Sequence, residues 1–214
     1  MVLSVLIRSD TNSRRAFFTK PKGAIFMQTN VKTKVLPRLS FRAQTLALAT
    51  ALVSAVALPQ IFHLIGAVSD LGTTVGASFL PMHLPIIIVG FIAGPYAGLV
   101  AGALAPVISF FLSGMPTIAM LPLMIAEISA YGLFAGLLRN TKLPAFGKLL
   151  SVQLLGRAAR AIATVAVVLF VSNTPITLAS IYTSILTGLP GILIQWAILP
   201  LLLYFVREKF GEEV

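Results

Sequence analysis

Long apolar segments follow one another along most of this chain, between residues 43 and 206. Short interruptions rich in glycine, proline or basic residues separate six of them, and most approach the roughly 20 residues that a helix needs to cross a bilayer. We place the segments at residues 43–65, 79–93, 96–112, 117–138, 149–171 and 178–206. Because lipid offers the backbone no hydrogen-bond partner, such segments form helices. The pattern predicts an all-α polytopic membrane protein with six transmembrane helices.

The composition agrees with a lipid environment and leaves no room for a soluble domain of useful size. Of the 214 residues, 57% are hydrophobic and only 10% are charged. The chain has no cysteine, which excludes disulfides, thiol chemistry and cysteine-based metal sites. It also lacks Walker A, GxSxG and HExxH sequences, so we expect neither an enzyme nor a bound cofactor.

Positive charge is spread unevenly, and its placement predicts how the helices cross the membrane. The formal net charge is +10, and nine of the sixteen lysines and arginines lie in the first 42 residues. The others lie in or beside residues 139–160 and after the last segment, whereas the connections 66–78, 113–116 and 172–177 carry none. Because basic loops stay in the cytoplasm, both termini are predicted to be cytoplasmic. The grouping beside apolar segments also argues against a nucleic-acid partner.

This charge pattern divides the chain into three parts. Residues 1–41 form a basic cytoplasmic segment that lacks a sustained helical period, and we expect it to be disordered. Residues 42–208 form the six-helix transmembrane domain, and residues 209–214 form a cytoplasmic tail.

A few ionisable side chains lie inside the apolar segments, where charge is costly unless it is paired or faces a cavity. Glu127 and Tyr131, four residues apart in the fourth segment, share one helix face. Arg157 and Arg160, three residues apart in the fifth segment, share another. Two antiparallel helices would pair Glu127 with Arg160 and Tyr131 with Arg157. The cluster is either a structural ion pair or also a ligand site, and its excess positive charge favours an anionic or strongly hydrogen-bonding ligand.

Most other candidates for ligand binding lie near the predicted outer ends of the segments. Aromatic rings, amides and imidazoles around an apolar cavity suit a flat heterocycle with a few polar edges. Taken alone, either imidazole is more typical of a satisfied interfacial residue than of a ligand contact, and the tryptophan could equally face lipid. With the buried cluster, the candidate ligand-binding set is Gln60, His63, Phe79, His83, Met115, Glu127, Tyr131, Arg160 and Trp196. Two histidines and one glutamate at different depths make no recognisable metal site.

A stripe of small residues marks the first segment. Ala43, Ala47, Ala51 and Ala55 recur every four residues and so lie on one helix face. In lipid, small side chains let another helix approach closely. That helix belongs either to this chain or to a separate membrane subunit.

A series of short motifs across residues 43–206 carries a family resemblance. The alanine stripe is followed by FLPMHLP at 79–85, Gly94-Pro95 with Gly98 and Gly102, Pro106, the turn Ser113-Gly114-Met115-Pro116, Glu127-x-x-x-Tyr131-Gly132, and Gly156-Arg157. Together these motifs resemble the substrate-binding S components of energy-coupling factor (ECF) vitamin transporters.

The resemblance implies a subunit of the bacterial cytoplasmic membrane that captures a vitamin or a vitamin precursor at its outer side. In such transporters a transmembrane T subunit and two ATP-binding-cassette ATPases supply the energy. The alanine stripe matches the motif through which S components dock onto the T subunit. The connection at residues 66–78 matches the loop that acts as a lid over the substrate.

The segment QIFHLIG at residues 60–66, together with FLPMHLP, looks most like members of the cobalamin-precursor branch, which handle α-ribazole or dimethylbenzimidazole. Relatives for pyridoxine or hydroxymethylpyrimidine, for pantothenate and for folate share parts of the pattern. Two other kinds of protein remain as alternatives: a structural or signalling membrane protein, and a proton-coupled carrier that works alone.

Overall fold

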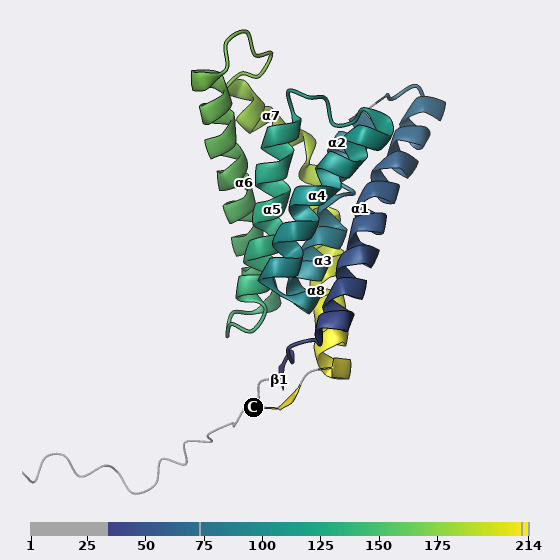
Figure 1. Cartoon of the computed structure of the whole chain (residues 1–214), viewed down its shortest axis with the longest axis vertical. Coiled ribbons are helices and arrows are strands. Elements are labelled where there is room, and N and C mark those ends of the chain that lie inside the picture. Colours follow the sequence, from purple (N-terminus) through teal and green to yellow (C-terminus); the bar gives the residue numbers. More distant parts are fainter. Residues whose placement is uncertain (1–33, 73, 211, 214) are drawn as a thin grey trace, which may run out of the picture. The chain divides into compact units, whose positions relative to one another are not determined.

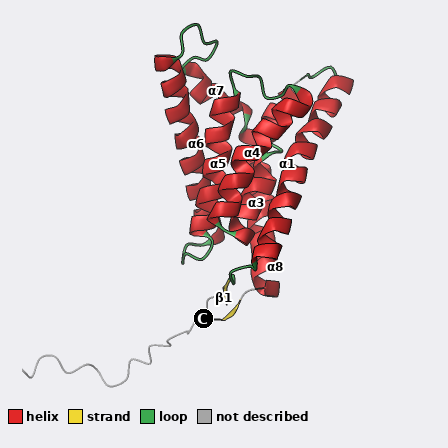
Figure 2. Cartoon of the chain, in the orientation of Figure 1, coloured by secondary structure: helices red, strands yellow, loops and turns green. Residues whose placement is uncertain are grey.

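The computed structural model describes residues 34–72, 74–210 and 212–213, and the part of the predicted disordered segment before residue 34 lies outside them. The described chain is a bundle of helices (Figures 1 and 2). The helices are α1 (Phe41–Val68), α2 (Thr74–Phe79), α3 (His83–Ala93), α4 (Pro95–Ser113), α5 (Leu121–Leu138), α6 (Ala145–Phe170), α7 (Ala179–Thr187) and α8 (Leu189–Phe210). Two short strands, β1 (Lys34–Val35) and β2 (Glu212–Glu213), pair antiparallel.

Six segments of the described chain are long and apolar enough to cross a membrane, which confirms the predicted architecture. They are Phe41–Val68, Thr74–Ala93, Pro95–Ser113, Leu121–Leu138, Ala145–Phe170 and Leu189–Lys209. The second combines α2 and α3. A short break at Leu80 and Pro81 separates these two helices, and Leu80 has φ of +49°.

The prediction of one bent helix over residues 178–206 was wrong. The chain forms two helices instead, and α7 ends at Gly188, whose N–H bonds back to the carbonyl of Ser184 at 3.2 Å. Pro190, which has no N–H to donate, then stands in the first turn of α8, a position that proline tolerates well. Of these two helices, only α8 is long enough to span a bilayer, so α7 can take another role.

Local signals set the ends of the helices on either side of α4. Gly94, with φ of +100°, ends α3, and Pro95 starts α4 directly afterwards. Gly114, with φ of +69°, caps the C-terminus of α4 in the left-handed region that glycine adopts without strain. The two turns therefore lie where the sequence predicted them.

The helix α5 packs on α3, α4 and α6, and so organises the bundle. A methyl group on Gly98 of α4 would collide with the backbone of Gly132 on α5, and the reverse also holds. The two backbones approach this closely only because neither residue has a side chain, as expected for helix packing in lipid.

The described ends of the chain meet the α5–α6 connection at one end of the bundle (Figure 1). The N–H of Leu36 donates to Oδ1 of Asn140 at 3.1 Å, and the guanidinium of Arg139 donates to the carbonyl of Pro37 at 2.7 Å. Arg207 near the end of α8 donates to the carbonyl of Arg139. Basic residues gather here, whereas the connections α1–α2, α4–α5 and α6–α7 at the other end have no described lysine or arginine. This distribution is the one on which the predicted sidedness rests.

Candidate functional site

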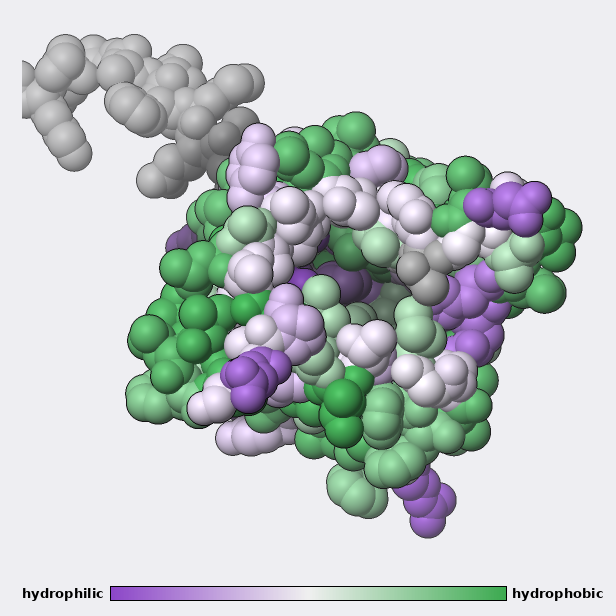
Figure 3. Space-filling view, turned by 90° about the horizontal axis from the view of Figure 1, so that it is seen from above, coloured by the Kyte–Doolittle hydropathy of each residue, from purple (hydrophilic) through white to green (hydrophobic). Residues whose placement is uncertain are grey.

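A cavity of about 450 Å³ lies at the end of the bundle where the uncharged connections meet. Seen from this side, the face is hollowed, and hydrophilic residues lie inside the hollow (Figure 3). The lining comes from α1 to α7 and includes the break between α2 and α3 and the α4–α5 connection. This volume lies within the range of pockets that bury small organic ligands.

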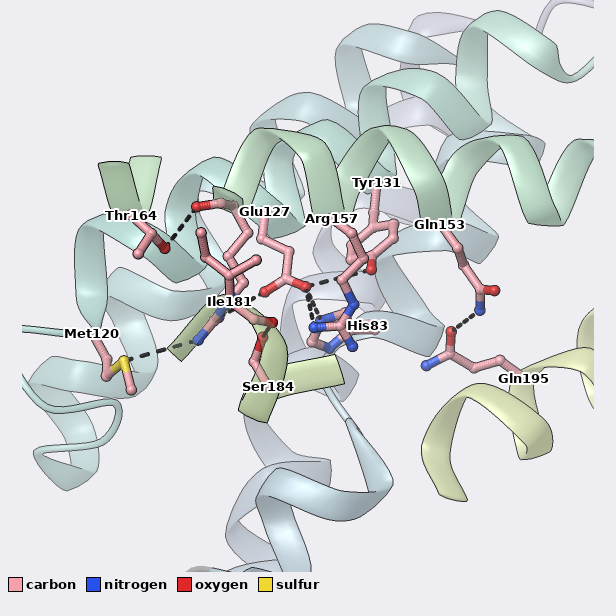
Figure 4. A network of polar contacts seen from close by, with 11 residues as sticks. His83, Met120, Glu127, Tyr131, Gln153, Arg157, Thr164, Ile181, Ser184 and Gln195 are labelled. Carbon is pink, nitrogen blue, oxygen red and sulfur yellow. Dashed lines mark hydrogen bonds and ion pairs between the residues drawn. The ribbon is translucent and has the colours of Figure 1, made fainter. Parts of the chain in front are cut away.

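Glu127 holds together the polar floor of this cavity (Figure 4). Its side chain is 2% exposed, with Nη1 of Arg157 at 2.9 Å from Oε1 and Nη1 of Arg160 at 2.8 Å from Oε2. Tyr131 donates its hydroxyl to Oε1 at 3.4 Å, and Nε2 of His83 lies 3.7 Å from the same oxygen. Four side chains from α3, α5 and α6 therefore converge on one buried carboxylate.

The arrangement differs in one respect from the two separate pairs that the sequence suggested. Arg157 contacts Glu127 instead of Tyr131, so each arginine takes one carboxylate oxygen. The tyrosine ring packs edge-on to His83, with centroids 5.1 Å apart, and directs its hydroxyl to the carboxylate. Gly156 makes this possible, because a methyl group there would meet the tyrosine ring at 2.5 Å.

The walls of the cavity combine two kinds of side chain. Four methionines supply flexible, polarisable apolar surface, and they are Met82, Met115, Met120 and Met124. Four hydroxyl groups come from one face of α7, and they belong to Ser180, Thr183, Ser184 and Thr187. The mixture of thioethers and hydroxyls suits a ligand with both an apolar body and polar substituents.

The sequence interpretation missed the α7 wall because it assigned residues 178–206 to one span. The signal was nevertheless present, since hydroxyl residues at positions 180, 183, 184 and 187 follow the i, i+3, i+4, i+7 spacing of one helix face. A lipid-facing span would not carry such a polar stripe, so the stripe could have identified a separate helix that faces a polar cavity.

The structure brings together five of the nine residues in the candidate ligand-binding set. His63, His83, Met115, Glu127 and Arg160 line the cavity, together with Arg157. Although His83 and Glu127 lie together, the described residues provide no third side chain that could complete a metal site with them.

The other four candidates lie elsewhere. Gln60 donates to the hydroxyl of Ser113 at 3.0 Å and so ties α1 to the end of α4. The ring of Phe79 packs on Phe62, with centroids 5.3 Å apart. Trp196 is 36% exposed and donates its indole N–H to Gln153. Tyr131 lies behind Glu127, 2% exposed, so it supports the floor without lining the cavity.

The alanine stripe of α1 is divided between the core and a surface groove. Ala51 and Ala55 are 7% and 0% exposed and belong to the hydrophobic core with α3 and α4. Ala55 is fully enclosed in this conformation, so the docking interpretation does not extend to it. Ala43 and Ala47 are half-buried, and a groove of about 430 Å³ between α1 and α3 is lined by both Ala47 and Ala51.

A comparison with known protein families decides what kind of protein this is. The family described as the ECF transporter, substrate-specific component, matches residues 43–203. The chain belongs to this family. A search of curated proteins and a search of solved structures gave no match.

Membership means that this S component is a substrate-binding subunit of a membrane transporter and is not an enzyme. The family also implies that a T subunit and ATPase subunits complete the transporter. The matched range includes all of the described cavity-lining residues, from Pro59 to Thr187. The cavity is therefore the natural candidate for the substrate site.

Proposed function

We propose that this S component binds a vitamin or a vitamin precursor in the cavity above Glu127, and that α-ribazole or dimethylbenzimidazole is its substrate. The carrying observation is the composition of the cavity, which joins four methionines, two histidines and the four hydroxyls of α7. A benzimidazole ring suits the thioether and imidazole surfaces, and ribose hydroxyls suit the serines and threonines. Pyridoxine or hydroxymethylpyrimidine, pantothenate and folate are the alternatives.

The proposal includes the setting of the subunit. The basic end of the bundle faces the cytoplasm of a bacterium, so the cavity opens to the outside. A T subunit contacts α1 at Ala43 and Ala47, and two ATP-binding-cassette ATPases drive release of the substrate inward. Support for the contact comes from the groove beside Ala47, which is lined by small and apolar side chains.

Mass spectrometry of the small molecule that copurifies with the full chain in detergent tests the substrate directly. We expect α-ribazole or dimethylbenzimidazole, and titration calorimetry should then give binding at micromolar concentration or below. Copurification of a different vitamin would replace the named substrate. If no vitamin or precursor copurifies or binds at micromolar concentration, the cavity is not a vitamin site.

A hydroxyl deletion on α7 tests whether the cavity is the place of binding. Thr183→Val removes one lining hydroxyl and keeps the shape of the side chain, so α-ribazole binding should weaken by about 5- to 10-fold, equivalent to one lost hydrogen bond. Thr177→Val, in the α6–α7 connection outside the lining, is the matched control and should bind normally. Equal affinity of both variants would place the ligand away from α7.

A further inference from the structure

We infer that the floor of the cavity binds one anionic group of the substrate, a carboxylate or a phosphoryl group, between Arg157 and His83. This inference rests on the proposed function for the place of binding, and it selects among the candidate substrates. It favours pantothenate, folate or α-ribazole as its 5′-phosphate over α-ribazole and dimethylbenzimidazole themselves, which carry no acidic group. It starts from a charge imbalance. Two guanidinium groups face one carboxylate among the described residues that line the cavity, which leaves one positive charge uncompensated even with both imidazoles neutral.

The uncompensated charge lies inside a membrane span, where it is costly unless a counter-charge approaches. Arg157 and Arg160 are shielded from solvent, with side chains 12% and 10% exposed. Water can therefore screen the extra charge only weakly. An anionic ligand group would balance the floor, whereas a neutral ligand would cover it and leave the charge buried.

Several hydrogen-bond donors of the floor have no partner, and their placement points to the same ligand group. Nε and Nη2 of Arg157 are buried and make no hydrogen bond to the described residues. The side chain of His83 is 4% exposed and lines the cavity; its Nδ1 has no partner among the described residues, and its Nε2 has only the 3.7 Å contact with Oε1 of Glu127. The hydroxyl of Ser180 on α7, another lining residue, is also buried without a partner among the described residues.

The guanidinium of Arg157 requires an acceptor. A guanidinium has only donors, so a ligand hydroxyl or amine N–H could not satisfy it as well as a carboxylate or phosphoryl oxygen. Arg157 uses Nη1 to contact Glu127 and keeps Nη2 and Nε for such a group.

Gly188 leaves the space beside Nη2 of Arg157. A methyl group on Gly188 would lie 2.9 Å from Nη2 and 3.0 Å from Cδ1 of Leu80, so any larger residue would displace the guanidinium. Gly188 has φ of −81°, which alanine adopts without strain. The absent side chain is therefore explained by the close neighbours of Gly188, which are Arg157, Leu80 and the carbonyl oxygen of Ser184 at 3.1 Å, and not by its own backbone angles.

Matched pairs of compounds that differ in one acidic group test the inference on the purified full chain. The pairs are pantothenate with its alcohol pantothenol, and α-ribazole 5′-phosphate with α-ribazole, each titrated by calorimetry. We expect the anionic member of the pair that binds to be at least about tenfold tighter, as for one charge-assisted hydrogen bond.

Two variants locate the effect. Arg157→Gln should reduce the anionic preference to about one, and Gly188→Ala should reduce it severalfold without removing any charge. The Gly188→Ala variant keeps the test valid if the Arg157→Gln variant does not fold. Arg42→Gln, on an exposed position of α1 at the basic end, is the control and should keep the preference.

The outcomes separate this inference from the proposed function. A neutral member that binds as tightly as its anionic partner overturns the inference and leaves the vitamin site in place. An anionic preference that persists in both floor variants also overturns it, because the anion then binds elsewhere. If no compound of either pair and no other vitamin binds, the proposed function fails together with the inference.

Discussion

Glu127 shows how one residue can stabilise neighbouring helices in lipid. Its two oxygens form ion pairs with Arg157 and Arg160 of α6, and one of them also accepts a hydrogen bond from the hydroxyl of Tyr131. An arginine in a membrane span needs such a partner, because breaking a buried pair leaves a charge without compensation. We therefore expect the carboxylate to be required for the packing of α5 on α6 as well as for the floor of the cavity.

Glu127→Gln should therefore lower stability markedly, by about 3–5 kcal/mol, since it leaves two buried guanidinium groups without a counter-charge. The measurement is thermal unfolding of the purified protein in detergent, with ligand affinity as a second readout. Asp70→Asn, the same change of acid to amide in the exposed α1–α2 connection, is the control and should unfold like the wild type. Wild-type stability of the Glu127→Gln variant would show that the cluster is not needed for packing.

At the scale of elements, α1 presents different surfaces along its length. Ala55 packs entirely in the core, whereas Ala47 and Ala51 contact the core and also border the groove against α3. Small side chains serve both purposes, because they allow close approach by any neighbouring helix. A stripe in the sequence therefore cannot by itself assign the neighbour.

Ala47→Trp should fill the groove and prevent assembly with the T subunit while leaving substrate affinity unchanged. Copurification of the T subunit measures assembly, and calorimetry of the isolated S component measures affinity. Ala49→Trp places the same bulk on an exposed position of α1 outside the groove and is the matched control. Normal assembly of the Ala47→Trp variant would remove the groove as the docking surface, and equal loss of substrate binding would assign it to internal packing.

At the scale of the whole molecule, the basic connection and chain ends lie at the opposite end of the bundle from the mouth of the cavity. The ends of the described chain and the α5–α6 connection gather the basic residues, while the cavity lies towards the uncharged connections. An even number of spans places both described ends on the same side, in agreement with the pairing of β1 and β2. This polarity suits a subunit that takes its substrate from outside and is energised from within.

The absence of cysteine allows a direct test of this sidedness. Ser172→Cys in the α6–α7 connection should react with a membrane-impermeant maleimide in intact cells. Thr141→Cys in the α5–α6 connection should react only after the cells are opened. The reverse labelling pattern would place the cavity on the cytoplasmic side.

Much of the fold could be predicted from the sequence because the signals are local. Apolar length defines the six spans, and the turns at Gly94 and Gly114 follow from glycine and proline chemistry. Two features were missed: α2, whose residues 74–78 were assigned to a connection, and the break at Gly188. At that break, Gly188 and Pro190 lie within an apolar run, and hydropathy alone does not separate α7 from α8.

Composition and spacing along the chain were enough to establish the class of protein, the number of spans and the small set of buried polar residues. The folded arrangement was needed to show which arginine meets which oxygen, and that α7 forms a wall of the cavity. It also separated His63 and His83, which line the cavity, from Phe79 and Trp196, which do not. The physical reason is that these contacts depend on how each helix is rotated about its axis. That rotation is set by the close approach of backbones such as those at Gly98 and Gly132.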